Sequence, residues 1–324
     1  MKNLIDFIIQ HHCSDLLISQ NNIIKIRKDG KLFDYPQQDN IATKEQIVEF
    51  IYQLSNQQIV ITDDIFTKAN SFNFAINFNS RYRIRCNLFQ HQGGIGLVAR
   101  VIDNQIQAIS TQPNLPHLFF ELTNYKSGLI IIAGKIGAGK STTMASIVEE
   151  VNLNQYKHII TLEDPIEFQY YNKKSLIHQL TIQTSDYQDQ LLFDQLFRQD
   201  PDLIVIGEIR NHNQFKLALK MAEAGHLVIT SMHGADTVSI VQRLYHSLPS
   251  QEIYLLAQNL KIIIAQQLLF ITNKDRTANY EIMINNNAIK NLILEGKIMQ
   301  IYNIITTSKQ QGMFSFKQHQ QEFK

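Results

Sequence analysis

The chain has 324 residues, of which 44% are hydrophobic and 18% charged, and such a chain can form one large domain or two domains with buried cores. Thirty basic and twenty-nine acidic side chains give a formal net charge of +1, which offers no general electrostatic argument for a nucleic-acid partner. The two cysteines, Cys13 and Cys86, lack the spacing of a structural zinc site and fit a reducing compartment.

The N-terminus predicts a short amphipathic helix rather than a signal peptide. Residues 1–10 hold one lysine and an apolar run that Asp6 interrupts. No stretch approaches the ~20 consecutive apolar residues of a transmembrane helix, so we expect no integral membrane segment. These features together predict a cytoplasmic protein.

Residues 1–102 have the pattern of a small α/β domain. Within residues 22–32, apolar and polar residues alternate and lead into the Asp29-Gly30 pair, which is typical of a β-hairpin turn. Residues 44–56 favour a helix, and we expect strands at 72–78, 81–89 and 95–101. The polar stretch 103–116 contains Pro113 and Pro116, and we interpret it as a linker.

From residue 117 to residue 324, strands alternate with helices. This order is typical of a parallel sheet that is covered by helices. The expected core strands are residues 128–133, 158–162, 203–206 and 227–231.

Residues 134–141, Gly-Lys-Ile-Gly-Ala-Gly-Lys-Ser, fit the phosphate-binding pattern G-x-x-x-x-G-K-[ST], with a strand before them and a helix after them. The backbone N–H groups would surround the phosphates at the positive end of the helix. Lys140 would reach the β- and γ-phosphates, and the Ser141 hydroxyl would bind Mg²⁺. The residues expected to bind ATP here are Gly134, Gly137, Ala138, Gly139, Lys140, Ser141 and Thr142.

Glu208 follows the expected strand 203–206. A carboxylate at the carboxyl end of a parallel strand lies where such sheets bind ligands. From there Glu208 could orient the attacking water or hold Mg²⁺ through water. The alternative is a strand that ends in a solvated glutamate.

Acids follow one other expected strand, and two histidines flank another. Glu163, Asp164 and Glu167 suit Mg²⁺ and water positioning, although in isolation they would indicate an acidic loop. His226 and His233 flank strand 227–231 without metal-ligand spacing. They could instead sense the γ-phosphate.

In chain order, the segments GKIGAGKST, TLEDPIEF, RQDPDLIVIGEIR and GHLVITSMH resemble the Walker A motif, Asp box, Walker B motif and His box of one family. This is the secretion-ATPase superfamily of type II secretion and type IV pilus motors. The chain is most similar to the twitching-motility retraction type, because it is short and lacks the four-cysteine zinc insert. The competence-pilus assembly type is also short and stays open.

The resemblance implies an α/β fold with a RecA-like P-loop ATPase core and a smaller PAS-like N-terminal domain. It implies a homohexamer that uses ATP and Mg²⁺, with Glu208, Glu163 and His233 in catalysis and with Ser141 and Glu208 at the metal. Basic residues of the N-terminal domain, Arg85 and Arg100 with Arg83 as a further candidate, would face the phosphates. Ordinary exposed strand charge is the alternative for these arginines. The resemblance also implies a location peripheral to the inner membrane, against a pilus platform protein.

Several positions depart from the family pattern. Lys135 and Ala138 replace a common Pro and Ser in the phosphate loop, where the backbone does the binding, and Leu17 replaces a common His. Gly234 stands where Thr is common, and Gln267 where Arg is usual. The Gln267 change bears on motor output more than on ATP binding.

Three functions stay open at this level. The first is a hexameric pilus motor, in which the sequence does not separate retraction from extension, competence or type II secretion. The second is an ATP-binding scaffold of the same machine that hydrolyses poorly, suggested by Gly234 and Gln267. The third, a nucleic-acid translocase, is disfavoured because the charge is balanced and no basic, aromatic-rich tract is present.

Overall fold

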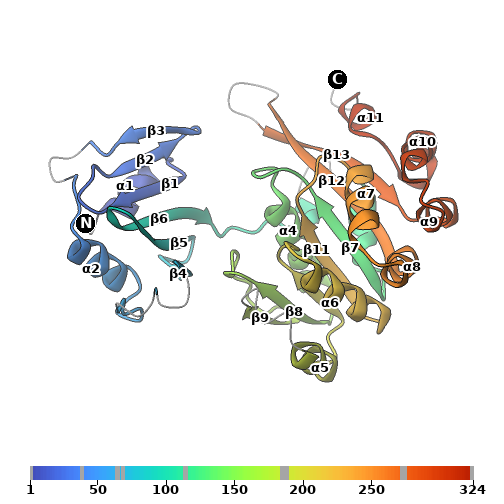
Figure 1. The fold of residues 1–324 in the computed structure, drawn as a ribbon, viewed down its shortest axis with the longest axis horizontal. Helices are drawn as coiled ribbons and strands as arrows, with labels where there is room; N and C mark the ends of the chain where they lie inside the picture. Colours follow the sequence, from blue (N-terminus) through green and yellow to red (C-terminus); the bar gives the residue numbers. More distant parts are fainter. Residues whose placement is uncertain are drawn as a thin grey trace. The chain divides into compact units, whose positions relative to one another are not determined.

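The computed structural model describes residues 3–36, 40–62, 66, 70–111, 116–182, 190–270 and 276–321. The chain divides into two compact units (Figure 1). The first unit consists of Met1–Gln105 and Pro165–Gln169, and the second consists of Ile106–Asp164 and Tyr170–Lys324. In the part of the chain that is described, no helix is both long enough and apolar enough to cross a bilayer.

The first unit is an antiparallel sheet with two helices. The sheet has the strand order β3-β2-β1-β6-β5-β4, and every pair in it is antiparallel. Its elements are α1 (Leu4–Gln10), β1 (Asp15–Ser19), β2 (Lys25–Lys28), β3 (Lys31–Asp34), α2 (Lys44–Leu54), β4 (Ser71–Asn77), β5 (Tyr82–His91) and β6 (Gly94–Asp103).

Helices α1 and α2 cover one face of this sheet. The buried side chains of both helices share one cluster with alternate residues of the strands, such as Ile84 and Leu88 of β5. The residues between them, such as Arg85, therefore lie on the opposite face. The predicted hairpin, helix and three strands of this region are confirmed, with ends that differ by at most two residues.

Residues Pro165–Gln169 belong to the first unit although they lie in the middle of the second unit's sequence. Arg83 Nε donates to the Ile166 carbonyl oxygen at 3.0 Å. Asn104 and Gln169 exchange two hydrogen bonds, of 2.8 and 3.3 Å, between the Asn104 amide and the Gln169 backbone. No local sequence pattern indicates this assignment.

The second unit is built on a sheet of order β13-β12-β7-β11-β10-β8-β9. All neighbouring strands are parallel except β12 and β13, which form an antiparallel pair. The strands are β7 (Gly128–Ala133), β8 (His158–Glu163), β9 (Leu176–Thr181), β10 (Leu203–Ile206), β11 (Leu227–Met232), β12 (Leu260–Phe270) and β13 (Arg276–Ile284). The helices are α3 (Leu118–Leu122), α4 (Lys140–Asn154), α5 (Gln190–Gln199), α6 (His212–Glu223), α7 (Thr237–Ser247), α8 (Ser250–Asn259), α9 (Asn287–Leu294), α10 (Ile301–Thr307) and α11 (Phe316–Gln320), with 3-10 turns at Ile109–Thr111, Ile298–Gln300 and Lys309–Gln311.

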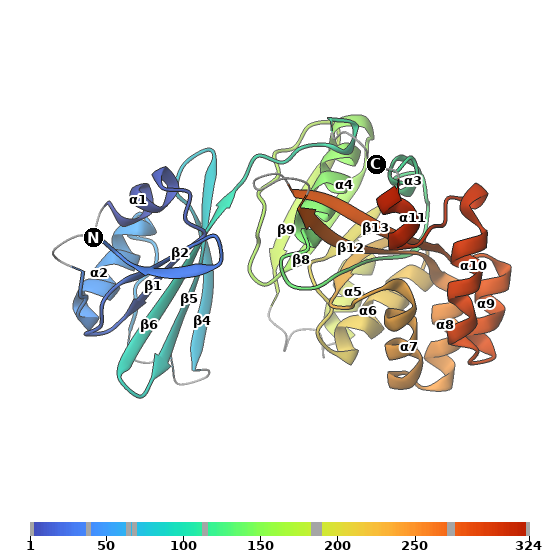
Figure 2. The ribbon, with the colours of Figure 1, turned by 90° about the horizontal axis from the view of Figure 1, so that it is seen from above.

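Helices cover both faces of this sheet, and Figure 2 shows α4 on one side and α6 and α7 on the other. All six residues of β7 are buried, because each face of the strand packs on a separate core. Leu129 and Ile131 pack with α6 and α7, whereas Ile130 and Ile132 pack with α3 and α4. A continuous apolar run is therefore what a central parallel strand requires. The four predicted core strands are confirmed.

Candidate functional site

The phosphate loop connects β7 to α4 at the carboxyl edge of the sheet. Gly139 is the N-cap of α4 with φ +87°, and Gly137 has φ +76°. Both values lie in the left-handed region, where a side chain is disfavoured, so glycine is needed for this bend. The loop thus brings its backbone to the positive end of a 15-residue helix.

Lys140 is the first residue of α4, and only 8% of it is exposed. Its ammonium group donates to the carbonyl oxygens of Gly134 at 2.9 Å and Lys135 at 3.3 Å. It also lies 3.3 Å from His233 Nδ1. Because a lysine ammonium can only donate, His233 Nδ1 must be the acceptor in this contact.

His233 joins this lysine to Glu208. With Nδ1 as an acceptor, the ring proton lies on Nε2, which is 2.8 Å from Glu208 Oε1. The other carboxylate oxygen, Oε2, accepts from Arg210 Nε at 2.7 Å. A continuous set of polar contacts therefore runs from Lys140 through His233 to Glu208, and the residues come from three segments that are well separated in sequence.

Glu163 ends β8, the strand beside β10, and so lies next to the backbone that leads to Glu208. A Cβ on Gly207 would lie 3.4 Å from Glu163 Cγ, and the Glu163 carboxylate accepts from Thr161 Oγ1 at 2.8 Å. The other two acids of this segment belong to different units, Asp164 to the second and Glu167 to the first.

Mg²⁺ prefers oxygen atoms as ligands, and oxygen-bearing side chains lie near the loop. Ser141 is partly buried and Thr142 is exposed in the first turn of α4, on the same edge as the two glutamates. Among the described residues, no three His, Cys, Asp or Glu side chains are grouped to hold a metal ion. Mg²⁺ in nucleotide sites takes most of its ligands from phosphates and water, so a single hydroxyl with nearby carboxylates fits this ion. The metal roles of Ser141 and Glu208 stay predictions.

His226, the other histidine of the segment, lies away from this group. It precedes β11, whereas His233 follows it, so the two stand at opposite ends of the strand. His226 is buried, and its Nδ1 lies 2.8 Å from the Pro201 carbonyl oxygen. This geometry indicates a structural role for His226.

Arg85 and Arg100 belong to the first unit, where they face each other directly across β5 and β6. Arg100 Nε donates to Asp15 Oδ1 at 2.7 Å, and Arg27 Nε lies 3.3 Å from Asp15 Oδ2. No acidic partner of Arg85 is found among the described residues. The predicted contact of either arginine with phosphates stays a prediction.

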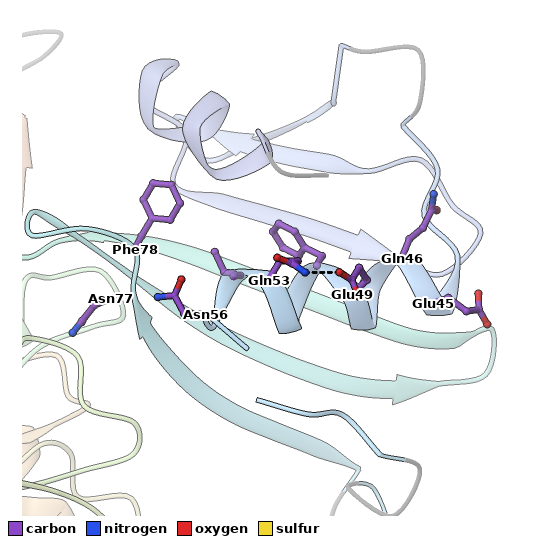
Figure 3. A pocket seen from close by; sticks show the side chains of 9 residues that line it. Glu45, Gln46, Glu49, Gln53, Asn56, Asn77 and Phe78 are labelled. Carbon is purple, nitrogen blue, oxygen red and sulfur yellow. Dashed lines mark hydrogen bonds between the residues drawn. The ribbon is translucent and has the colours of Figure 1, made fainter. Parts of the chain in front are cut away.

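A cavity of about 580 Å³ in the first unit does not suit a nucleotide (Figure 3). The figure shows the side chains that line it, and Glu49 accepts from Gln53 Nε2 at 2.7 Å. The lining consists of Glu45, Gln46, Glu49, Phe50, Gln53, Leu54, Asn56, Asn77 and Phe78. Among the described lining residues there are two carboxylates and no lysine or arginine, and the carboxylates would repel phosphates.

A cavity of about 380 Å³ in the second unit adjoins the group around Glu208. It is lined by Ile209, Arg210, Asn211, His212, Phe215, Met232, His233, Arg243, Leu244, Ser247 and Leu248. Arg210 and His233 thus contact Glu208 and line this space as well.

Sequence reasoning missed Gln266, whose buried side chain contacts both the phosphate loop and α4. Its neighbour Gln267, which the sequence singled out, is exposed. The signal available was a polar residue inside the apolar stretch 260–270. The structure also gives a packing reason for Gly234, since a Cβ there would lie 2.3 Å from Ile240 Cδ1.

Known proteins resemble this chain over nearly its whole length. A sequence model of the family described as "Type II/IV secretion system protein" matches residues 1–321. The chain is 31% identical over 325 residues to the Escherichia coli protein YggR, covering 99% of this chain and 97% of that protein. It is 32% identical over 320 residues to the Pseudomonas aeruginosa "Type IV pilus retractation ATPase PilT", covering 96% and 90%.

A solved structure agrees with these matches. The crystal structure of the pilus retraction motor PilT with bound ADP is similar with a TM-score of 0.82 at 27% identity, covering 99% of this chain and 92% of that one. The predicted α/β fold with a RecA-like core is therefore confirmed. The PAS-like character of the first unit stays a prediction.

Proposed function

This chain belongs to the Type II/IV secretion system protein family, and we propose that it binds and hydrolyses ATP as the motor of a type IV pilus. The observation that carries the proposal is the set of contacts from Lys140 through His233 to Glu208. It joins a phosphate-loop lysine to a carboxylate at the end of a neighbouring core strand. A glycine-rich turn with a purely structural role would need neither group.

Three side chains take different roles in the proposed hydrolysis. Glu208 orients the water for in-line attack on the γ-phosphate and accepts its proton. Lys140 neutralises negative charge on the β- and γ-phosphates. Glu163, at the end of the adjacent strand β8, helps to position this water.

His233 reports what Lys140 is bound to. When Lys140 turns its ammonium toward the phosphates, His233 Nδ1 loses a hydrogen-bond donor, and this changes its bond to Glu208. A local charge change at the phosphate is thereby passed to the strand ends, which is how nucleotide switches act. When bound, Mg²⁺ supplies charge neutralisation at the phosphates, with the Ser141 hydroxyl as its protein ligand.

The motor is proposed to be a homohexamer in which hydrolysis rotates one domain against the other. Arg85, and Arg100 if it leaves Asp15, would add positive charge where phosphoryl transfer develops negative charge. Arg85 is the better candidate, since Arg100 is already paired with Asp15.

The pilus role rests on the relatives' names. The Pseudomonas aeruginosa relative is called a pilus retraction ATPase, which supports retraction in this chain. We propose that the protein works in the cytoplasm, peripheral to the inner membrane, against a pilus platform protein. Extension, competence or type II secretion are the alternatives. Accumulation of pili after deletion of the gene would identify retraction, whereas loss of pili would identify extension or assembly.

ATP turnover tests the enzyme. Steady-state ATPase rates are measured for the unsubstituted protein, for Glu208→Gln and for Lys140→Ala, with Glu295→Gln on an exposed loop as the matched control. We expect losses of about 10²-fold or more in the first two variants and none in the control. Equal, near-background rates in the unsubstituted protein and Glu208→Gln would discard the motor in favour of an ATP-binding scaffold.

A further inference from the structure

We propose that Gln266 is a positioning residue for phosphate binding: its buried side-chain amide fixes the peptide between Ala138 and Gly139, so that the loop's N–H groups face the nucleotide. The proposal rests on the proposed nucleotide binding and adds a residue that the four motifs do not contain. Gln266 belongs to β12, more than a hundred residues after the phosphate loop.

The Gln266 side chain makes two hydrogen bonds. Its Nε2 donates to the Ala138 carbonyl oxygen at 2.7 Å. Its Oε1 accepts from the Thr143 hydroxyl at 2.7 Å. Since a carbonyl can only accept, the bond to Ala138 also fixes which way the amide is turned. One side chain therefore ties the loop to the first turns of α4.

The bond to Ala138 determines where an N–H group points. A trans peptide is planar, and its C=O and N–H point in opposite directions. Because the Ala138 carbonyl points at Gln266, the Gly139 N–H must point away from β12. Gly139 is the N-cap of α4, where backbone N–H groups bind phosphates.

Gln266 packs closely against the phosphate loop. A Cβ on Gly139 would lie 2.9 Å from Gln266 Nε2, and a Cβ on Gly134 would lie 2.6 Å from the Gln266 carbonyl oxygen. A side chain at position 134 would therefore collide with the β12 backbone, and one at position 139 would collide with the Gln266 amide. The register explains this approach, since the pairing of β7 with β12 ends at Ala133 and Ala265.

Burial makes the two hydrogen bonds necessary. Only 3% of Gln266 and 8% of Thr143 is exposed, so neither side chain has water as an alternative partner. Replacing the amide by an apolar group of similar size leaves the Ala138 carbonyl and the Thr143 hydroxyl without this partner. The peptide can then rotate and lose its alignment with the phosphate.

The test measures ADP affinity, together with KM for ATP and kcat, in Gln266→Met. We expect the ADP Kd and the KM to rise about tenfold while kcat stays within about twofold, because the loop holds phosphates that are present before and after the reaction. A merely structural role would reduce the amount of active protein and lower kcat at constant KM. Gln267→Met, the same change at the exposed neighbour, should leave the ADP Kd unchanged.

Thr143 supplies a second test that holds if Gln266→Met fails to fold. Thr143→Val should weaken ADP binding, and Thr143→Ser, which keeps the hydroxyl, should bind ADP as the unsubstituted protein does. Where Gln266→Met folds, its effect and that of Thr143→Val should be strongly non-additive. Unchanged ADP affinity in folded Gln266→Met or in Thr143→Val, additive effects, or a fall in kcat at constant KM would overturn the inference alone. If the unsubstituted protein bound no ADP, the proposed function would fall and take this inference with it.

Discussion

Glu281 is a buried carboxyl group whose ionisation should destabilise the folded protein. It lies in β13 with 3% of its surface exposed, and its Oε1 accepts from the Thr237 backbone N–H at 2.9 Å and from the Thr237 hydroxyl at 2.8 Å. Burial raises the pKa of Glu281 above 4.5, although the hydrogen bonds from Thr237 act in the opposite direction. This contact holds the start of α7, because Thr237 is the first residue of that helix and follows its N-cap, Asp236.

The direction of the pH effect on stability follows from proton binding by Glu281. Between 4.5 and the raised pKa, the native state holds more protons than the unfolded state, so the free energy of unfolding falls as pH rises. Above the raised pKa the penalty is complete and constant. Glu281→Gln keeps an acceptor for Thr237 and removes the charge, so its stability relative to the unsubstituted protein should increase with pH through this window.

The size of the effect of truncation follows from the lost contacts. Each hydrogen bond from a buried donor contributes about 1 kcal/mol, so Glu281→Ala should lower the free energy of unfolding by about 2 kcal/mol. The assay is urea unfolding at a series of pH values from 4.5 to 8 for Glu281→Gln, Glu281→Ala and the exposed control Glu223→Gln. A constant stability difference between Glu281→Gln and the unsubstituted protein over this range would refute the reasoning.

Three further outcomes are expected. Asp15→Ala should destabilise the first unit by about 1–2 kcal/mol in urea unfolding, since it leaves two arginines without their buried carboxylate, and a null result would mean that solvent replaces it fully. The Cys86 thiol, whose pKa burial raises to about 12, should resist a thiol reagent at pH 8 until urea unfolds the protein, and rapid native labelling would contradict its burial. Gly139→Ala should cost about 1–2 kcal/mol and weaken ADP binding, because φ is +87° and its Cβ would approach the Gln266 amide; thermal unfolding with and without ADP measures both.

Patterns confined to a few neighbouring residues were sufficient for much of the fold. The apolar run 128–133 predicted a strand buried on both faces, and the glycines of 134–141 predicted a tight turn into a helix. Alternation likewise predicted the hairpin around Asp29-Gly30 and the strands of the first unit. The spacing of apolar residues and the choice of turn residues are local properties of the chain, so no tertiary information was needed.

Partners from distant parts of the chain could not be predicted in this way. The sequence directed attention to Gln267, but strand pairing places Gln266 beside the loop. It suggested both Arg85 and Arg100 for the phosphates, but only the structure shows that Asp15 holds Arg100.

The amino-acid sequence determined that the chain carries the pattern of a phosphate loop, acids at two strand ends and a histidine after a third, because each follows from residue type and spacing along one segment. Only the tertiary structure decided that His233 contacts both Lys140 and Glu208 and that the Gln266 side chain bonds to the loop. The physical reason is that the order of strands in a sheet sets which strand ends are neighbours, and that order results from the packing of the whole core rather than from any local pattern.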